Sequence, residues 1–568
     1  MKEKTKIYPH VIPEIRDWPI YKLHENRKEF IDEIVAFTLE RMTVHPVSEL
    51  SDIIAKTIYL ERIRIKEEPW KVDPPNEKQF WRRIKKKLVK KSLDNTDQAA
   101  ASNNEEILRI IIRRYAEEIV GTFRKKTFLF ARRFLTFFFK SLLNTLAHPR
   151  RWKLGGGKRR LGSRLLLKGK VDSVRGLMKK GTVVIVPTHF SNLDSILIGY
   201  AMDTFAGLPS FAYGAGLNLY NTGYTAYFMN RLGAYRVDRR KKNSVYLETL
   251  KAMSNLAIQR GTNSLFFPGG TRSRSGALES KLKLGLLSTV IEAQRASYQK
   301  GEDKKIFIVP LILSYHTVLE AQFLIEQYLR RMGKERYIKK SRDQFTSFRK
   351  IVKFAWQVFF QGNDITLSFG QPMDVLGNPV DDDGNSHDQY GKRIEVKEYF
   401  VSSGDVKKDL QRESQYTKLL AEAIVDRYHR DNIVLASHLI AYAAFKYLAY
   451  QNRKLDLFGI LRLPTEDFDF PHDTLERIVE DLRTELTEME AKEQIKLSTK
   501  VRSLSPAELV EEGVRRLGIY HVAKPLRYDK HKQIVSDSFK LLYYYHNRLD
   551  NYQLEEKVHW KERTLETV

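Results

Sequence analysis

The sequence predicts an α/β domain with a central, mostly parallel sheet and flanking helices, placed between helical N- and C-terminal regions. Between about residues 165 and 375, short apolar runs alternate with stretches of helical periodicity, which is the order expected of parallel strands joined by helices. Outside these limits, apolar residues recur mostly at helical spacing. We therefore expect four parts: helical residues 1–122, a basic and aromatic amphipathic segment with a linker at 123–165, the α/β domain at 166–375, and helical residues 376–568.

The composition indicates a large globular protein with a strong positive charge. The 568 residues include 98 Lys and Arg against 70 Asp and Glu, a formal net charge of +28. Such a charge attracts phosphorylated substrates and acidic lipid headgroups. It would also attract nucleic acid, but no recognition module for nucleic acid is visible, so we expect no nucleic-acid partner. The absence of cysteine excludes a catalytic thiol and cysteine metal ligands from this chain.

We expect no signal peptide and no transmembrane helix, because the N-terminus is charged and no run of about 18 uncharged apolar residues occurs. Residues 123–146 instead interleave phenylalanines with Arg and Lys. This pattern predicts a helix in the membrane interface whose long cationic side chains reach the headgroups. The alternative is a helix packed beneath the C-terminal region. The predicted location is peripheral, on the cytoplasmic face of a membrane, with anionic lipid as a partner.

The central feature is an apolar run at residues 183–186, followed by His189 and then Asp194. The run predicts a buried strand, and residues 191–202 have helical spacing with Asn192 as the expected N-cap. His189 would then lie in the strand-to-helix turn and fold back onto Asp194. A carboxylate that holds one imidazole nitrogen leaves the other free to take a proton from a hydroxyl. For an isolated His-x4-Asp pair, a capping aspartate beside a turn histidine is the commoner explanation.

Three downstream segments favour the catalytic interpretation. They are residues 233–240, which end in two arginines, residues 266–276, an apolar strand followed by a glycine-rich turn with two more arginines, and residues 306–315, an apolar strand interrupted by proline. In this order and spacing, the four segments resemble the glycerolipid acyltransferase superfamily, which transfers acyl chains to glycerol phosphate and lysophosphatidate. The resemblance covers roughly residues 169–372.

The glycine-rich segment looks most like the glycerol-3-phosphate and dihydroxyacetone-phosphate acyltransferase branch, because residues 272–276 are Arg-Ser-Arg-Ser-Gly and a lysine follows at position 283. Asn218 and the Gly-Ala-Tyr at 233–235 also look like that branch. One departure concerns Gly269, where family members usually carry a glutamate that is thought to help hold the acceptor. Glu279 lies nearby in the sequence and is a candidate to replace that carboxylate.

The resemblance implies an O-acyltransferase that moves a fatty acyl chain from a thioester to a hydroxyl of glycerol 3-phosphate in phospholipid biosynthesis. His189 would be the general base and Asp194 its partner. The acceptor phosphate would be bound by Arg239, Arg272, Arg274 and Lys283, since guanidinium groups match phosphate oxygens, and the acceptor pocket would contain Gly269, Gly270, Thr271 and Ser273. Acyl-CoA or acyl carrier protein would be the co-substrate. We expect no metal and no further cofactor, because a thioester is already activated.

Alternatives stay open at this point. The acceptor could be lysophosphatidate or dihydroxyacetone phosphate, with the same chemistry. A membrane-associated, lipid-binding scaffold is the alternative from another class, suggested by Gly269 and by the long terminal regions. The presence of both His189 and Asp194 counts against the scaffold.

Overall fold

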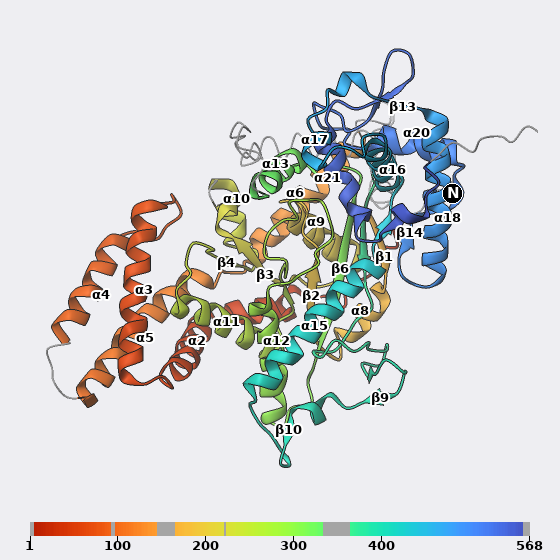
Figure 1. Ribbon diagram of the computed structural model, residues 1–568. Helices are drawn as coiled ribbons and strands as arrows, with labels where there is room; N and C mark the ends of the chain where they lie inside the picture. Colours follow the sequence, from red (N-terminus) through yellow and green to blue (C-terminus); the bar gives the residue numbers. More distant parts are fainter. Residues whose placement is uncertain (1–4, 92–96, 145–164, 221–222, 333–363, 561–568) are drawn as a thin grey trace, which may run out of the picture.

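The computed structural model describes residues 5–91, 97–144, 165–220, 223–332 and 364–560. Figure 1 shows a central sheet flanked by helices, a helical lobe from the N-terminal region beside it, and the C-terminal helices gathered at another end. The predicted α/β class with helical terminal regions is confirmed. The division into four parts stays a prediction.

Seven strands form the central sheet in the order β1-β7-β6-β2-β5-β3-β4. Neighbouring strands are parallel except β6 and β7, which are antiparallel. Strands β2 and β6 are buried along almost their whole length, because helices cover both faces of the sheet. The strands are β1 Leu165–Gly169, β2 Gly181–Pro187, β3 Ala212–Gly216, β4 Ala234–Val237, β5 Ser264–Leu265, β6 Lys305–Tyr315 and β7 Ile365–Phe369.

Helices connect these strands and cover the sheet. They are α8 Val171–Leu177, α9 Asp194–Ala201, α10 Gly223–Met229, α11 Ser244–Gln259, α12 Leu284–Gln299 and α13 Ala321–Arg331. Because side chains of a strand alternate between its faces, the valine and isoleucine at 183 and 185 of β2 share a core with Leu197 of α9, whereas the valines at 184 and 186 share one with Val290 of α12. The turn between β2 and α9 is thereby held from both faces of the sheet.

The N-terminal helices share a hydrophobic core with the α/β domain. Helices α2 to α5 bury apolar residues against Val245, Leu250 and Met253 of α11. Among the described residues, no helix is both long and apolar enough to cross a membrane. The N-terminal helices are α1 Pro19–Glu25, α2 Arg27–Met42, α3 Val47–Glu67, α4 Glu77–Lys91, α5 Asp97–Ile119 and α6 Lys125–Asn144.

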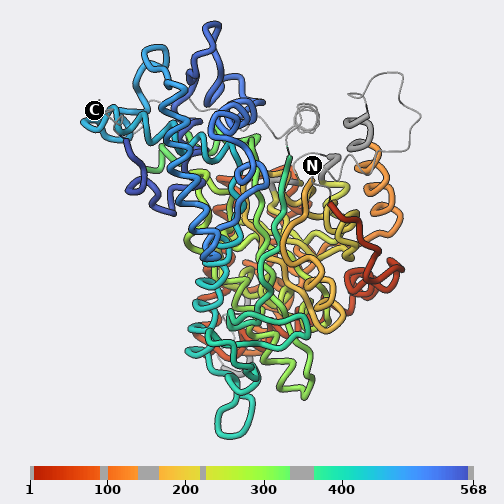
Figure 2. The backbone as a smooth tube through the Cα atoms, turned by 90° about the vertical axis from the view of Figure 1, so that its right-hand side faces the viewer, coloured from red at the N-terminus to blue at the C-terminus, as the bar shows by residue number. Residues whose placement is uncertain are grey.

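The C-terminal region packs against the α/β domain through α16 and α21, whose buried residues Leu439 and Leu542 belong to the same core as Leu313 of β6. Figure 2 shows α15 (cyan) running along the α/β domain and the later helices (blue) gathered at one end. The helices are α15 Leu410–Arg430, α16 Ala436–Gln451, α17 Leu457–Ile460, α18 His472–Ala491, α19 Thr499–Ser503, α20 Pro506–Arg516 and α21 Phe539–Asp550. Short strands lie before and between these helices: β8 Ser386–His387, β9 Arg393–Ile394, β10 Val401–Ser402, β11 Asp405–Val406, β12 Ile433–Val434, β13 Asp469–Phe470, β14 Lys496–Leu497, β15 Arg527–Tyr528 and β16 Ile534–Val535.

Candidate active site

The turn between β2 and α9 holds His189 against Asp194. The Nδ1 atom of His189 lies 2.8 Å from Oδ2 of Asp194, and the same oxygen accepts hydrogen bonds from the backbone N–H groups of Phe190 and Ser191, at 2.7 and 2.9 Å. Asp194 is fully buried. None of the described residues forms a hydrogen bond with the second ring nitrogen, Nε2. The structure therefore brings the two residues together as expected, and their catalytic roles stay predictions.

Tyr315, the last residue of β6, completes the environment of Asp194. Its hydroxyl donates a hydrogen bond of 2.6 Å to Oδ1 of the carboxylate. Burial and the negative charge of Asp194 raise the pKa of Tyr315 well above its ordinary value, so the hydroxyl keeps its proton and remains a donor. Both oxygens of Asp194 are thus fixed, and the carboxylate can orient the imidazole of His189 without rotating.

Glu320, the residue before α13, connects this turn to an arginine of the glycine-rich segment. Its carboxylate accepts hydrogen bonds from Ser191 Oγ at 2.9 Å, from the N–H of Asn192 at 3.0 Å and from Arg272 Nη1 at 3.0 Å. Burial raises the pKa of Glu320, and the positive charge of Arg272 opposes that shift. Because carboxylates already bind the N–H groups of this turn, α9 begins at Asp194, and the prediction of Asn192 as its N-cap is wrong.

A cavity of about 250 Å³ lies beside His189. The ring of Phe267 stacks on the imidazole with 4.1 Å between ring centroids and forms part of the wall. Phe266 and Phe267 follow β5 instead of belonging to it, because the N–H of Gly270 closes a turn on the carbonyl of Phe267. The polar side chains of the wall include three of the predicted phosphate ligands, Arg239, Arg272 and Arg274, together with Thr271, Ser195 and Gln327.

The three arginines create an excess of positive charge at this cavity. Arg239 forms no hydrogen bond or ion pair with any of the residues that the structure describes, and partial desolvation together with the charge of Arg272 lowers its pKa. Arg274 donates to the side chain of Gln327 at 3.2 Å, and desolvation and neighbouring arginines lower its pKa as well. The charge of Arg272 therefore destabilises the charged forms of Arg239 and Arg274, and an anion in the cavity would relieve that repulsion.

Comparison with known proteins agrees with this geometry. Residues 169–314 match the family described as Acyltransferase. The chain carries an acyltransferase domain. It is 28% identical over 232 residues to the glycerol-3-phosphate acyltransferase of Pseudoalteromonas atlantica, 38% of this chain and 26% of that protein. It is 34% identical over 149 residues to the probable mitochondrial glycerol-3-phosphate acyltransferase of Caenorhabditis elegans, 25% of this chain and 20% of that protein.

A longer match, to the glycerol-3-phosphate acyltransferase of Shewanella amazonensis, has 24% identity over 330 residues, 57% of this chain and 36% of that protein. The chain therefore matches only 20% to 36% of the length of these relatives. The predicted resemblance to the superfamily, and to its glycerol-3-phosphate acyltransferase branch, is confirmed for the acyltransferase domain.

Several predicted site residues lie behind the wall of the cavity instead of lining it. Gly269, Gly270 and Ser273 belong to the turn that backs His189, and the N–H of Ser273 donates to the His189 carbonyl at 2.7 Å. Lys283 is exposed, and its side chain packs against Gly270, because α12 begins immediately after it. The side chain of Asn218 lies outside the described part of the chain.

The N-terminal region also contributes to the cavity of the acyltransferase domain. Trp70, between α3 and α4, lines the cavity, and the guanidinium carbon of Arg240 lies 4.5 Å from the centroid of its ring. Arg240 is further held by Asp238 at 2.8 Å and by Asp73. The sequence motifs do not mark Trp70, which lies more than a hundred residues before the acyltransferase segments.

The C-terminal helix α21 braces the acyltransferase domain from the other side. Asn547 donates to the carbonyl of Ser275, at the end of the glycine-rich turn, at 2.8 Å. Arg548 donates to the carbonyl of Leu313 at 2.8 Å, and its guanidinium carbon lies 4.6 Å from the centroid of the Phe190 ring. The two turns that carry His189 and the arginines are therefore both supported by residues outside the domain.

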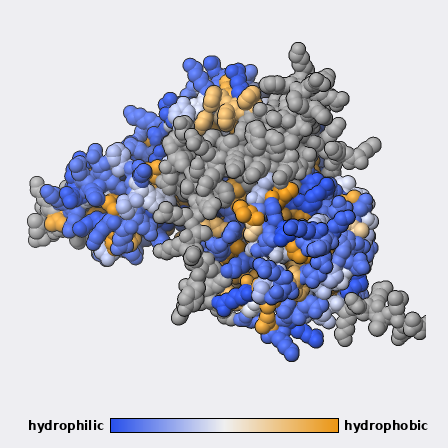
Figure 3. All heavy atoms as spheres, turned by 90° about the horizontal axis from the view of Figure 1, so that it is seen from above, coloured by the Kyte–Doolittle hydropathy of each residue, from blue (hydrophilic) through white to orange (hydrophobic). Residues whose placement is uncertain are grey.

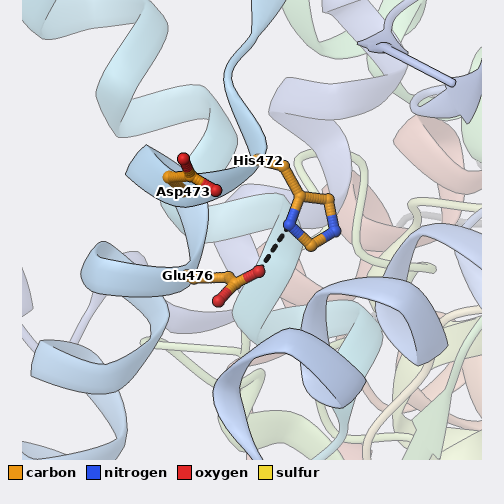
Figure 4. Close-up of side chains that lie close together, drawn as sticks. All are labelled: His472, Asp473 and Glu476. Atoms are coloured by element: carbon orange, nitrogen blue, oxygen red, sulfur yellow. Dashed lines mark ion pairs between the residues drawn. The ribbon is translucent and has the colours of Figure 1, made fainter. Parts of the chain in front are cut away.

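One group of His, Asp and Glu side chains among the described residues is close enough to share a metal ion, and it lies away from the cavity. It consists of His472, Asp473 and Glu476 at the N-terminal end of α18 (Figure 4), where His472 Nδ1 is 2.6 Å from a Glu476 oxygen. Acidic side chains are common at helix N-termini because of the helix dipole. We assign no metal site to this group.

Proposed function

We propose that this protein transfers a fatty acyl chain from an acyl thioester to a hydroxyl of glycerol 3-phosphate, as a step of phospholipid biosynthesis. The observation that carries the proposal is one cavity lined by both the imidazole of His189 and the guanidinium group of Arg239, which pairs with no carboxylate in the described part of the chain. A base beside an anion site suits an acceptor that has both a hydroxyl and a phosphate.

In the reaction, Nε2 of His189 takes the proton of the acceptor hydroxyl while the hydroxyl oxygen attacks the thioester carbonyl. Asp194 holds Nδ1 and stabilises the imidazolium that forms. The tetrahedral intermediate then collapses, the C–S bond breaks, and the imidazolium returns its proton to the leaving thiolate. Both acyl-CoA and acyl carrier protein present such a thioester, so either carrier satisfies this chemistry.

Arg239, Arg272 and Arg274 bind the phosphate in this proposal. Arg272 already contacts Glu320, which fixes its position relative to the His189 turn, whereas Arg239 keeps its donors for the ligand. A phosphate that engages these groups places the acceptor hydroxyl next to the base, and such positioning lowers the barrier of a bimolecular step. The names of the similar proteins support glycerol 3-phosphate as the acceptor.

We also propose that α6 contacts the surface of an anionic membrane. Phe130, Phe134 and Phe137 on this helix are 58%, 38% and 70% exposed, and two arginines, at positions 132 and 133, lie among them in the sequence. Arg132 pairs with Asp203 at 2.6 Å, which fixes α6 to the acyltransferase domain. Figure 3 shows small apolar areas beside hydrophilic ones on one face of the molecule. A peripheral location would deliver the acylated product to the bilayer.

The test of the proposed activity is acyl transfer from a long-chain acyl thioester to glycerol 3-phosphate, dihydroxyacetone phosphate and lysophosphatidate in parallel, with unphosphorylated glycerol as the control. We expect glycerol 3-phosphate to be the best acceptor and glycerol to be poor. Preference for lysophosphatidate or dihydroxyacetone phosphate would keep the chemistry and refute the acceptor. A folded, lipid-supplemented protein that acylates none of them would favour a lipid-binding scaffold.

A further inference from the structure

Glu279 occupies the space that a side chain at position 269 would fill. A Cβ atom added to Gly269 would lie 3.0 Å from Cγ and 3.1 Å from Oε1 of Glu279, closer than carbon atoms pack without displacement. The backbone of Gly269 is not in the left-handed region, in contrast to that of Gly270 with φ of +75°. The side chain of Glu279, and not the backbone conformation, therefore crowds a larger residue at position 269, which would require Glu279 to shift.

The carboxylate of Glu279 is bonded directly to the turn that carries His189. Its Oε1 atom accepts a hydrogen bond of 3.0 Å from the backbone N–H of His189. Its Oε2 atom is buried and has no hydrogen-bond partner among the described residues. Buried polar atoms without a partner are uncommon in native proteins. This one belongs to the carboxylate that holds the backbone of His189.

The charges around Glu279 belong to the same site. Burial raises the pKa of Glu279 to about 7, the negative charge of Asp194 adds to that shift, and the bond to His189 and the positive charge of Arg548 oppose it. Burial raises the pKa of Tyr428, and the negative charge of Glu279 raises it further, so the two side chains lie near each other. Glu279 thus interacts with both members of the His189–Asp194 pair, with the backbone of His189 through a hydrogen bond and with Asp194 through its charge.

We propose that Glu279 is a positioning residue for His189, and that its carboxylate uses the space that the small residue at position 269 leaves open. The inference rests on the proposed acyl transfer for its kinetic consequences and on the hydrogen bond to His189 for its structural ones. Gly269 and Glu279 then form a matched pair, because the absence of a side chain at position 269 leaves room for the side chain of Glu279. The departure at position 269 thus leaves room for a carboxylate that holds the His189 turn from outside the cavity.

The matched pair can be tested by moving the carboxylate. Glu279→Ala is compared with Gly269→Glu, with the double variant Gly269→Glu/Glu279→Ala, and with Ser280→Ala, an exposed neighbour, as the control. We expect Glu279→Ala to lower kcat about tenfold or more, as removal of a residue that orients a functional side chain does, with the KM for glycerol 3-phosphate nearly unchanged. The double variant should recover most of that loss, whereas Gly269→Glu alone should be impaired because two side chains compete for one space.

A kcat of Glu279→Ala equal to that of the wild type would overturn the proposal. So would a folded double variant that is no more active than Glu279→Ala, since a merely structural acid would not be replaced from position 269. If the double variant does not fold, the kinetics of Glu279→Ala decide.

Amide hydrogen exchange at His189, followed by mass spectrometry, tests the same inference without turnover. Exchange of the peptide that contains His189 should be about tenfold faster or more in Glu279→Ala and should slow again in the double variant. Unchanged exchange in Glu279→Ala would contradict the proposal. A wild type that transfers no acyl group, with the expected exchange pattern, would refute the proposed function and leave the role of Glu279 standing.

Discussion

Arg239 and Arg240 are adjacent in the sequence but lie in opposite environments. Arg240 donates to Asp238 at 2.8 Å, pairs with Asp73 and stacks on Trp70. Arg239 lines the cavity and forms no ion pair with the described residues. One guanidinium group is therefore used to hold the N-terminal region, while its neighbour remains available to a ligand.

This difference predicts opposite effects of the same substitution. Arg239→Ala should raise the KM for glycerol 3-phosphate by about 10- to 100-fold, the cost of a lost charged hydrogen bond, with the free energy of unfolding nearly unchanged. Arg240→Ala should lower the free energy of unfolding by about 3 kcal/mol, because the buried carboxylate of Asp238 loses its ion pair. Steady-state kinetics and denaturant unfolding of both variants measure the two effects. An unchanged KM in Arg239→Ala would exclude that residue from the phosphate site.

Tyr315→Phe removes the donor to Oδ1 of Asp194 while keeping the ring. A buried acceptor without its donor costs about 1–3 kcal/mol, so we expect a lower unfolding free energy and a kcat reduced about tenfold. The KM for the acceptor should stay near the wild-type value, since Tyr315 does not line the cavity. Tyr298→Phe, a buried tyrosine on α12, is the control. A wild-type kcat in Tyr315→Phe would show that Asp194 does not need this bond.

Glu279 should make the stability of the protein depend on pH. Its pKa is raised from 4.5 to about 7 by burial, so the native state holds a proton that the unfolded state has already released. The stabilisation is fully present below pH 4.5 and is lost as the pH rises through 7, about 3 kcal/mol in total at 1.4 kcal/mol per pKa unit. Glu279→Gln removes this titration. Melting temperatures of both proteins from pH 4 to 8 should therefore diverge, and parallel curves would contradict the burial of an ionisable carboxylate.

Helix α6 should determine membrane binding. Phe130→Ser/Phe137→Ser removes two exposed aromatic rings, and because burying each ring contributes about 1.5–3 kcal/mol, binding to vesicles of phosphatidylcholine and phosphatidylglycerol should weaken at least about tenfold. Tyr390→Ser, at a position 86% exposed and far from α6 in the sequence, is the control. Vesicle flotation measures the binding. Equal flotation of the double variant and the control would refute the interfacial role of α6.

The sequence predicts best those strands that are buried on both faces. The runs that form β2 and β6 are apolar throughout because both faces of these strands are covered, and the His189–Asp194 pair follows from the short turn between β2 and α9. Lys283 is a different case. The family motif places it near the phosphate, but α12 begins at the next residue, and its side chain packs behind Gly270.

Three residues of the site could not be predicted, because only the tertiary fold brings them there. Tyr315 contacts Asp194 across 121 residues of chain, and Glu320 contacts Ser191 across 129. Trp70 belongs to a part of the chain that has no acyltransferase motif. Each is an ordinary residue in its local sequence and acquires its role only when β6, α13 and the N-terminal helices pack around the turn after β2.

The most direct test of the account is the kcat/KM for glycerol 3-phosphate in the wild type, His189→Ala and Asp194→Asn, with melting temperatures to confirm folding. General-base catalysis contributes about 10²- to 10⁴-fold, so we expect His189→Ala to lose at least about 100-fold and Asp194→Asn to lose activity in the same direction. A folded His189→Ala that retains wild-type kcat/KM would contradict the assignment of His189 as the base, and with it the proposed mechanism.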